Sequence, residues 1–362
     1  MSRHQTAVLL LVLVAVGLTV GGCRTETAPT ALPPPARPAA TLAGPGGMGA
    51  GHVAALQTMP DATLVGVCDV NPEVRKTFKD QGLPAFEKWD DLYASVEADC
   101  ALINLPHYLY PEAVIGALER GLHVLKEKPF ARNLADAERM ATAAQASGRI
   151  LMIAGQTKFL PAFQKAHELI QTGALGDIFL ARYSIIYYWS AARENHWSWR
   201  GKQALSGGVA IIDSGYHPLD QMQWFRGLPE AVYAVTGKMK AAPGTDYDVD
   251  DKAVVTLEYP DGGLGVVTIC FVTLPGENHL LLHGTKASLD VEGACATLLP
   301  REGAPEQFSF AETDALAAEQ REFMAAIREN RAPLGTPEHA LQVQRVIEAA
   351  YQSAATGQRI TL

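Results

Sequence analysis

Lys128, Asp213 and His217 are the residues of this sequence whose types and spacing favour proton-transfer chemistry. Lys128 lies in the tripeptide Glu127–Pro129, directly after an apolar run that is typical of a buried strand. The carboxyl ends of strands in a doubly wound sheet face the ligand crevice, so we expect Lys128 to point at a bound ligand. Its amine would then take part in proton transfer. A surface lysine in a charged turn is the alternative that the tripeptide alone leaves open.

Asp213 and His217 are four residues apart in a glycine-rich segment that runs from Gly207 to Asp220. On a helix this spacing places both side chains on one face, where a carboxylate can orient an imidazole and raise its basicity. A general base needs that arrangement. Pro218 has no backbone N–H, so we place the pair in the first turn of the helix. The alternative is a pair that only caps or stabilises this helix.

A glycine-rich turn at residues 44–49 has the G-x-G-x-x-G spacing of a dinucleotide site. The residues assigned to cofactor binding in this turn are Gly44, Gly46, Gly47, Met48 and Gly49. The glycines permit a tight turn and close approach to a pyrophosphate, which the following helix N-terminus attracts. Asp69 follows about 20 residues later, where a carboxylate binds a ribose 2′-hydroxyl and repels a 2′-phosphate. The pattern therefore predicts NAD, with NADP less favoured, and an incidental glycine turn is the alternative.

Apolar periodicity predicts a doubly wound α/β domain, of the Rossmann type, for residues 41–155. The expected strands are Thr63–Cys68, Cys100–Asn104, His123–Leu125 and Ile150–Ala154, and the expected helices are Val53–Gln57, Pro72–Gln81, Pro111–Arg120 and Leu134–Ala146. The strand before the glycine turn, Ala39–Ala43, lacks a run of valine or isoleucine. That weakness points to reduced cofactor affinity or to an altered N-terminus.

Residues 156–362 follow a different pattern, because successive strands occur without helices between them. This predicts an α+β domain with a mostly antiparallel sheet. The expected strands are Ile178–Tyr188, Ala231–Met239, Lys252–Tyr259, Gly263–Val272, His279–His283 and Ala287–Val291, and the expected helices are Pro161–Gln171, Ile211–Phe225, Ala315–Asn330 and Pro337–Ala355.

The first 23 residues have the features of a bacterial lipoprotein signal. Ala7–Val20 is continuously apolar or small but shorter than the ~20 residues of a membrane span, which is typical of a signal peptide. Cys23 follows two glycines, as in a lipobox, and residues 24–40 are rich in Pro, Ala and Thr, which predicts an extended linker. We expect a lipid anchor through Cys23 and a place in the cell envelope, or the cytoplasm if the start codon is misassigned. An uncleaved anchor is a further alternative.

The composition narrows the classes of partner. The formal net charge is -9 and no run is rich in Lys and Arg, so we exclude a nucleic-acid partner. The cysteines other than Cys23 lie in apolar segments without C-x-x-C spacing; they are Cys68, Cys100, Cys270 and Cys295. We predict buried free thiols there rather than disulfides, and no metal site.

Taken together, the motifs resemble the glucose–fructose oxidoreductase/inositol dehydrogenase (Gfo/Idh/MocA) family. The resemblance runs from about Gly44 to the C-terminus and is carried by residues 44–49, Asp69, Glu127, Lys128, Pro129, Gly207, Gly208, Asp213, Gly215, His217, Asp220 and Ala349–Ser353. It implies a Rossmann domain followed by a domain with an open-faced sheet that binds substrate and forms homo-oligomers. It also implies that Lys128, Asp213 and His217 are catalytic. Pro106, Glu127, Lys128 and Pro129 would contact the cofactor, with a cis bond before Pro129.

Several positions depart from the family pattern and would alter the substrate pocket. His107 stands where Asn is common, Tyr110 where His is common, and Lys158 where Arg is frequent. Candidate substrate contacts are Tyr110, Lys158, Trp199, Arg200 and Asp220, with Tyr187, Trp197 and Lys202 as further candidates for stacking on or hydrogen-bonding a sugar. Each of the aromatic residues is equally consistent with a place in a core or an interface.

The sequence thus predicts hydride transfer between NAD and a carbinol carbon of a sugar, inositol or related polyol. His217, oriented by Asp213, would remove the hydroxyl proton, and Lys128 would polarise that oxygen or relay the proton. Three alternatives remain at this stage: a glycoside hydrolase that acts by transient NAD-dependent oxidation, a non-catalytic sugar or nucleotide sensor, and an envelope scaffold.

Overall fold

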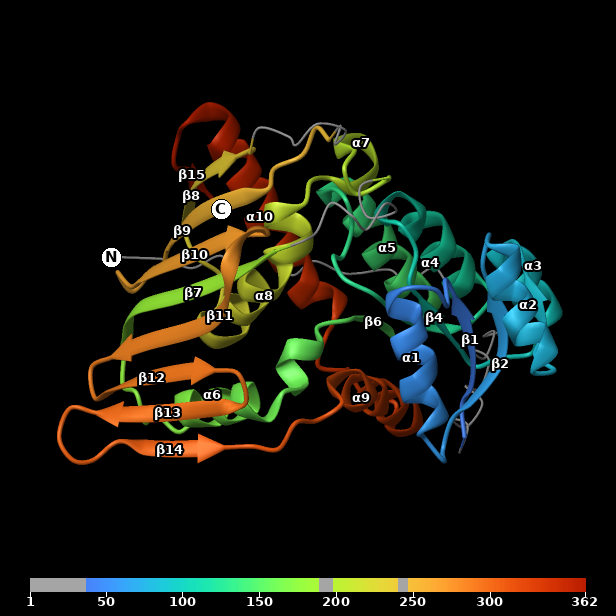
Figure 1. The fold of residues 1–362 in the computed structure, drawn as a ribbon, viewed down its shortest axis with the longest axis horizontal. Coiled ribbons are helices and arrows are strands. Elements are labelled where there is room, and N and C mark those ends of the chain that lie inside the picture. The colour runs from blue at the N-terminus through green and yellow to red at the C-terminus, as the bar shows by residue number, and fades with distance from the viewer. Residues whose placement is uncertain (1–36, 189–197, 240–246) are drawn as a thin grey trace, which may run out of the picture. The chain divides into compact units, whose positions relative to one another are not determined.

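The computed structural model describes residues 37–188, 198–239 and 247–362, which form two β-sheets with associated helices (Figure 1). The predicted signal segment at residues 1–23, the linker as far as residue 36, and Trp197 lie outside the described residues. The predicted α/β class, with one parallel and one mostly antiparallel sheet, is confirmed.

The first sheet consists of parallel strands in the order β3-β2-β1-β4-β5-β6, the order of a dinucleotide-binding sheet. Its strands are β1 (Ala39–Ala43), β2 (Thr63–Cys68), β3 (Ala85–Phe86), β4 (Cys100–Ile103), β5 (His123–Lys126) and β6 (Leu151–Ile153). The helices that alternate with them are α1 (Met48–Gln57), α2 (Pro72–Asp80), α3 (Trp89–Ser95), α4 (Tyr110–Glu119) and α5 (Leu134–Ser147). The sequence analysis missed the short β3 and α3.

β1 lies at the centre of this sheet, between β2 and β4, although its sequence was the weakest strand signal. Ala40, Leu42 and Ala43 are fully buried. The strand forms because its backbone hydrogen bonds to β2 and β4 do not depend on side-chain type. Both faces of the sheet are covered, so small apolar residues are enough to keep β1 buried. Because β1 begins at Ala39, the last two residues of the predicted 24–40 linker belong to the sheet.

The second sheet has the order β14-β13-β12-β11-β7-β10-β9-β8-β15. Its strands are β7 (Ile178–Tyr188), β8 (Ala231–Gly237), β9 (Lys252–Glu258), β10 (Leu264–Cys270), β11 (Val272–Gly284), β12 (Ala287–Glu292), β13 (Cys295–Pro300), β14 (Glu306–Ser309) and β15 (Ile360–Thr361). β7 and β10 pair in parallel, and the other neighbours are antiparallel. The sequence analysis missed β13, β14 and β15.

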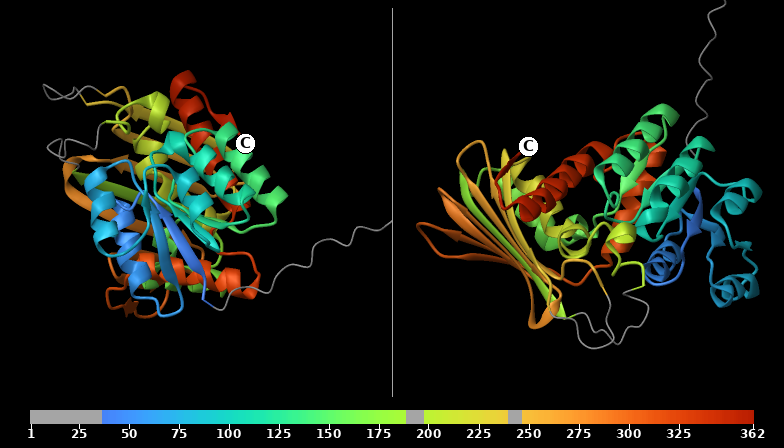
Figure 2. Two further views of the ribbon diagram at one scale, coloured as in Figure 1. Left: turned by 90° about the vertical axis from the view of Figure 1, so that its right-hand side faces the viewer. Right: turned by 90° about the horizontal axis from the view of Figure 1, so that it is seen from above.

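Helices cover one face of the second sheet, and no described helix covers the other (Figure 2). The helices of this part are α6 (Pro161–Gln171), α7 (Gln203–Ser206), α8 (Tyr216–Arg226), α9 (Ala315–Glu329) and α10 (Pro337–Thr356), together with the short turns η2 (Gln156–Phe159) and η3 (Ala210–Ser214). A further short turn, η1 (His107–Leu109), connects β4 to α4 of the first sheet. Large apolar side chains are exposed on the sheet strands at Phe179, Tyr233, Val235, Val254 and Leu264.

α9 packs against α1 of the first sheet, although it belongs to the last part of the chain (Figure 1). The Asp314 side chain caps its first turn by accepting a hydrogen bond from the Ala317 N–H. Phe323, Met324 and Ile327 of α9 join the apolar core that covers one face of the first sheet. The segment after the second sheet therefore helps to build the nucleotide-binding half of the molecule, which periodicity alone did not predict.

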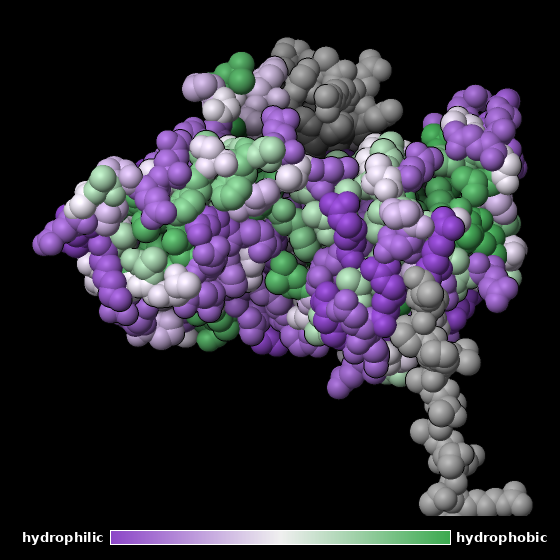
Figure 3. All heavy atoms as spheres, turned by 90° about the horizontal axis from the view of Figure 1, so that it is seen from below, coloured by the Kyte–Doolittle hydropathy of each residue, from purple (hydrophilic) through white to green (hydrophobic). Residues whose placement is uncertain are grey.

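The molecular surface in Figure 3 is mainly hydrophilic, with hydrophobic residues in separate patches. Among the described residues, no helix has the length and apolar character needed to cross a membrane. Cys68 and Cys100 are buried free thiols as predicted, and burial raises the pKa of Cys68 to about 12. Cys270 and Cys295 are free but only half-buried, so the prediction that they are buried was wrong.

Candidate active site

The turn after β5 carries Lys128 at the edge where the strands of the first sheet end. The Lys128–Pro129 peptide bond is cis, as the resemblance implied. Lys126, fully buried, donates hydrogen bonds from its Nζ to the backbone carbonyls of Glu127 (2.6 Å) and Pro129 (2.5 Å). The same Nζ lies 3.6 Å from the centre of the Tyr110 ring. Lys126 therefore fixes the backbone of this turn by hydrogen bonds to two of its carbonyl groups. This role was not predicted from the sequence.

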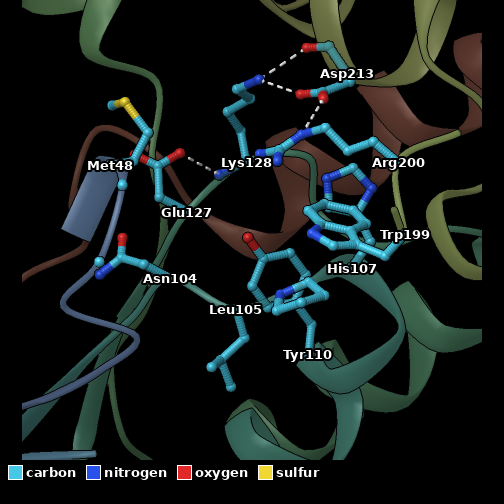
Figure 4. A pocket seen from close by; sticks show the side chains of 13 residues that line it. Met48, Asn104, Leu105, His107, Tyr110, Glu127, Lys128, Trp199, Arg200 and Asp213 are labelled. Atoms are coloured by element: carbon cyan, nitrogen blue, oxygen red, sulfur yellow. Dashed lines mark hydrogen bonds and ion pairs between the residues drawn. The ribbon is translucent and has the colours of Figure 1, made fainter. Parts of the chain in front are cut away.

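The Lys128 ammonium is paired with Asp213, which approaches from the second sheet's side of the pocket (Figure 4). Its Nζ lies 2.5 Å from Oδ1 of Asp213 and donates a second hydrogen bond to the Asp213 carbonyl at 2.9 Å. Arg200 donates from Nε to the other carboxylate oxygen at 3.1 Å. Burial raises the pKa of Asp213, but Lys128 and Arg200 lower it by more and hold it well below its usual range. Asp213 is thus an anion between two cations.

The predicted orientation of His217 by Asp213 is wrong. The described partners of the Asp213 carboxylate are Lys128 and Arg200, whereas Nδ1 of His217 lies 3.5 Å from Oγ1 of Thr157. The cause is local: η3 is a π-helical turn, in which the Gly215 N–H bonds to the Ala210 carbonyl five residues back. The wider turn breaks the four-residue periodicity on which the prediction depended. α8 begins only at Tyr216, so Asp213 and His217 do not belong to one regular helix.

His217 is nevertheless close enough to Lys128 and Asp213 for their charges to affect its pKa. Burial lowers its pKa to about 4, and the positive charge of Lys128 adds to that shift. The imidazole is therefore neutral at pH 7 and able to accept a proton. His217 does not line the pocket that Lys128 and Asp213 line.

Asp250, which the sequence analysis missed, fixes the turn that carries Asp213. Its carboxylate accepts hydrogen bonds from the N–H groups of Val209 (2.9 Å) and Ile211 (3.0 Å) and from the Tyr351 hydroxyl at 3.1 Å. Gly208 has a φ of 124° and packs so closely that a Cβ there would lie 2.0 Å from the Tyr351 oxygen. The glycine in this motif is therefore required by contact with α10, and α10 supports the turn that carries Asp213.

A pocket of about 220 Å³ lies between the glycine turn, the β5 turn and Asp213. It is lined by Gly46, Gly47, Met48, Asn104, Leu105, Pro106, His107, Tyr110, Glu127, Lys128, Trp199, Arg200 and Asp213. Most of the predicted cofactor and substrate residues thus come together. Lys128 and Arg200 converge on Asp213 at one end of the pocket, and Met48 and Asn104 lie toward the other (Figure 4).

The glycine turn fits a dinucleotide. A Cβ on Gly44 would lie 2.2 Å from the Asn104 carbonyl, and one on Gly49 would lie 1.9 Å from the Gly44 carbonyl, so both positions require glycine. Gly47, with a φ of 55°, borders open space and leaves the start of α1 without a side-chain cap. Asn104 has a buried amide nitrogen without a partner among the described residues. Open helix N–H groups and an orphaned donor are what an anionic, polar cofactor satisfies.

The aromatic wall of the pocket is formed by His107, Tyr110 and Trp199. The His107 and Trp199 rings meet edge to face, with centroids 4.6 Å apart. Burial lowers the pKa of His107 to about 3, and its Nδ1 lies 2.8 Å from the Ser206 carbonyl, to which the neutral ring donates. The histidine is therefore a fixed, uncharged part of the wall rather than an acid or base.

Lys158 and Asp220, predicted as substrate contacts, are placed elsewhere. Their side chains are 3% and 2% exposed and form an ion pair at 2.6 Å, with His339 of α10 against both. Neither residue lines the pocket. The pair joins η2, α8 and α10 behind the site, so its contribution is to hold these elements. Tyr187 hydrogen-bonds to Ser214, and Lys202 directly precedes α7; neither lines the pocket.

Two family descriptions match this chain. "Oxidoreductase family, NAD-binding Rossmann fold" matches residues 40–155, and "GFO/IDH/MocA C-terminal domain" matches residues 163–290. The chain belongs to the Gfo/Idh/MocA oxidoreductase family. This family membership confirms the predicted resemblance and an NAD-binding first sheet.

Several similar proteins in the Gfo/Idh/MocA family are named for reactions on sugars. D-glucoside 3-dehydrogenase of Escherichia coli (strain K12) is 26% identical over 86% of this chain and 93% of its own length. 2,7-anhydro-N-acetylneuraminate hydratase of the same organism is 31% identical, but the match covers 56% of this chain and only 54% of that protein. The structure of the WlbA dehydrogenase from Bordetella pertussis with NADH and UDP-GlcNAcA has a TM-score of 0.79 and 26% identity, covering 90% of this chain and 99% of that one.

Removal of the Asp250 carboxylate should loosen the turn that carries Asp213. We expect Asp250→Ala to lower the free energy of unfolding by at least about 2 kcal/mol, because three donors lose their acceptor. Tyr351→Phe removes one of these donors and should cost about 1 kcal/mol. Urea unfolding measures both, with Asp80→Ala on exposed α2 as the control. Equal losses in all three variants would show that Asp250 has no special place in the fold.

Proposed function

We propose that this protein is an NAD-dependent oxidoreductase that transfers a hydride between nicotinamide and a carbinol carbon of a sugar or polyol. The observation that carries the proposal is the convergence of Lys128 and Asp213 on a pocket bordered by the glycine turn. Relatives named as sugar dehydrogenases support the substrate class. The dehydrogenase names of these relatives and the intact ion pair between Lys128 and Asp213 give no support to a sensor or a scaffold.

Bound NAD would supply the hydride acceptor, and the chain's own residues would bind and orient the reactants. Lys128, held by Asp213, presents a positive charge in the pocket, where it would bind and polarise the reacting oxygen of a hydroxyl substrate. His217 is neutral at pH 7 but lies outside the lining of the pocket, so the hydroxyl proton would reach it by way of Lys128. Arg200 and Trp199, which also line the pocket, would exclude water and contact the rest of the sugar.

Lys128 and His217 can be tested by substitution once a sugar or polyol substrate has been found by screening. We expect Lys128→Ala and His217→Ala each to lower turnover at least about 100-fold, because proton transfer by a positioned group contributes that much. NADH formation and the oxidised product are measured together, which also separates a dehydrogenase from a redox-neutral reaction. Lys76→Ala, an exposed lysine of α2, is the control. Near-normal rates in both pocket variants would overturn the proposed roles.

Asp69 supports a preference for NAD over NADP. Its Oδ1 accepts a hydrogen bond from the Asn71 N–H, and its Oδ2 lies 3.6 Å from where a Cβ on Gly46 would be. The second oxygen therefore faces the glycine turn, beside the place for an adenosine ribose.

Asp69→Ala should weaken NADH binding by about tenfold, since it removes a charge-assisted hydrogen bond, and should improve NADPH binding because a 2′-phosphate is no longer repelled. Fluorescence titration with both nucleotides measures the two effects. Glu87→Ala, an exposed glutamate that pairs with Arg75, serves as the control. An unchanged ratio of the two affinities would exclude this role for Asp69.

A membrane anchor and a homo-oligomer stay predictions. The apolar segment Ala7–Val20 followed by Cys23 supports the anchor and, with it, the prediction of a location in the bacterial envelope. The oligomer is supported by the apolar side chains exposed on the second sheet, such as Phe179 and Val254.

Mass spectrometry of the full chain purified from a bacterial host tests the anchor. We expect a product that begins at an acylated Cys23, and we expect Cys23→Ser to retain residues 1–22 without acylation. A wild-type chain that keeps residues 1–22 and carries no acyl group would refute the anchor.

A further inference from the structure

A cluster of buried ionisable side chains lies behind the floor of the pocket. It consists of His52 of α1, Glu127 of the β5 turn and Glu319 of α9, whose ring and carboxyl atoms lie within 4.8 Å of one another. All three residues are buried, and Glu127 alone of the three also lines the pocket. Two carboxyl groups this close in a low-dielectric interior cannot both ionise without a large cost.

The contacts of His52 fix which ring nitrogen carries the proton. The Gln320 amide nitrogen lies 2.9 Å from Nδ1 and 3.0 Å from the His52 carbonyl, so it donates to both. Nδ1 is therefore an acceptor, and the ring proton is on Nε2, which donates to Oε1 of Glu127 at 2.9 Å. Burial lowers the pKa of His52, and Glu127 raises it by more. A proton on Nδ1 would nevertheless point at the hydrogens of the Gln320 amide, which would be unfavourable. The contacts of His52 therefore favour a ring with a single proton, on Nε2.

Glu127 has the partners of an anion. Oε1 accepts from His52, and Oε2 accepts from the Lys128 N–H at 3.0 Å. Burial raises the pKa of Glu127, but the hydrogen bond from His52 and the charge of Lys128 lower it by more. The negative charge of the cluster therefore lies on Glu127, directly beside the turn that carries Lys128.

The described contacts of Glu319 include no ion pair that would stabilise a negative charge. Oε1 accepts from the Gly155 N–H at 2.6 Å, and Oε2 is buried without a hydrogen-bond partner in the described part of the chain. The ionisable groups that face it are Glu127, His52, Lys158 of η2 and Tyr216 of α8, and Lys158 is already paired with Asp220. Burial raises the pKa of Glu319 to about 8, and the charge of Glu127 contributes to the same shift.

We propose that Glu319 is a neutral carboxylic acid in the folded protein and a positioning residue that leaves Glu127 as the single negative charge behind the cofactor pocket. The ring nitrogen of His52 and the carboxyl oxygens of Glu127 and Glu319 are also atoms of the kinds that bind metal ions. A ring proton on Nε2 and two occupied oxygens on Glu127 favour a held proton over a metal ion.

The proposal has a consequence for cofactor binding, and this part rests on the proposed function. When Glu319 loses its proton at alkaline pH, a second negative charge appears behind the pocket. That charge stabilises a positively charged nicotinamide and has no such effect on the reduced, neutral ring. The ratio of NAD+ affinity to NADH affinity should therefore rise as the pH passes about 8.

Infrared spectroscopy of the protein without cofactor tests the protonation directly. We expect a C=O band of a buried carboxylic acid that disappears on titration past about pH 8 and is missing in Glu319→Gln. Glu329→Gln, an exposed glutamate of the same helix, should keep the band. Should Glu319→Gln not fold, Glu127→Gln is the second variant, in which the band must disappear at a lower pH because the neighbouring charge is gone. A band that is unaffected by these changes overturns the proposal.

Unfolding experiments give a second readout with a definite sign. The folded-state pKa of Glu319 is raised from 4.5 to about 8, so the folded protein binds more protons than the unfolded chain in that window. Wild-type stability should therefore fall relative to that of Glu319→Gln as the pH rises from about 4.5 to about 8 and remain level above it. A difference that does not change with pH would mean that Glu319 has only a packing role.

Titration of NAD+ and NADH at pH 6 to 9.5 then tests the link to the cofactor. The affinity ratio should change at least about fivefold more in the wild type than in Glu319→Gln, a modest coupling between two sites. If neither nucleotide binds the wild type, the proposed function fails while the infrared result still decides the state of Glu319. If both bind and the two proteins show the same pH dependence, the coupling is wrong.

Discussion

The ion pair between Lys128 and Asp213 joins two segments that are 85 residues apart in the chain. One segment ends β5 of the parallel sheet, and the other is a π-helical turn beside the second sheet. A largely buried carboxylate is stable only with charged partners and hydrogen bonds around it, and here Lys128 and Arg200 supply them. The pocket exists because the folding of both halves brings these charges together.

The supports of this ion pair come from several elements, each of which limits how far the site can move. Lys126 holds the backbone of the β5 turn, and Asp250 holds the turn that carries Asp213. Tyr351 of α10 shares the Asp250 carboxylate and packs on Gly208. The buried polar groups around the pocket are connected to one another, so a change in one partner alters the geometry of the next.

The C-terminal helices contribute side chains to the surroundings of the pocket. α9 completes the core over the first sheet and brings Glu319 behind Glu127, while α10 supplies Tyr351 and His339. Glu319 thereby lies near two buried ion pairs, that of Lys158 with Asp220 and that of His52 with Glu127. This arrangement sets the electrostatic environment of the pocket from behind, where solvent does not screen it.

Local signals in the sequence predicted much of the fold. Alternating apolar segments located most strands and helices, the glycine spacing located the dinucleotide turn, and the Glu-Lys-Pro motif located Lys128, because these features depend on residues close in sequence. Short elements such as β3 and β15 lack enough residues to show a period.

Tertiary structure decided which side chains meet. The four-residue spacing predicted that Asp213 lies beside His217 on a regular helix. The segment instead forms a π-helical turn that Asp250 stabilises. In this turn the Asp213 carboxylate contacts Lys128 and Arg200. The burial of Lys158 and Asp220, and the meeting of His52 with Glu319 from 267 residues further along the chain, were likewise beyond periodicity. The physical reason is that a charge buried by folding takes whichever partner the packed elements bring within reach, and no local pattern records that distance.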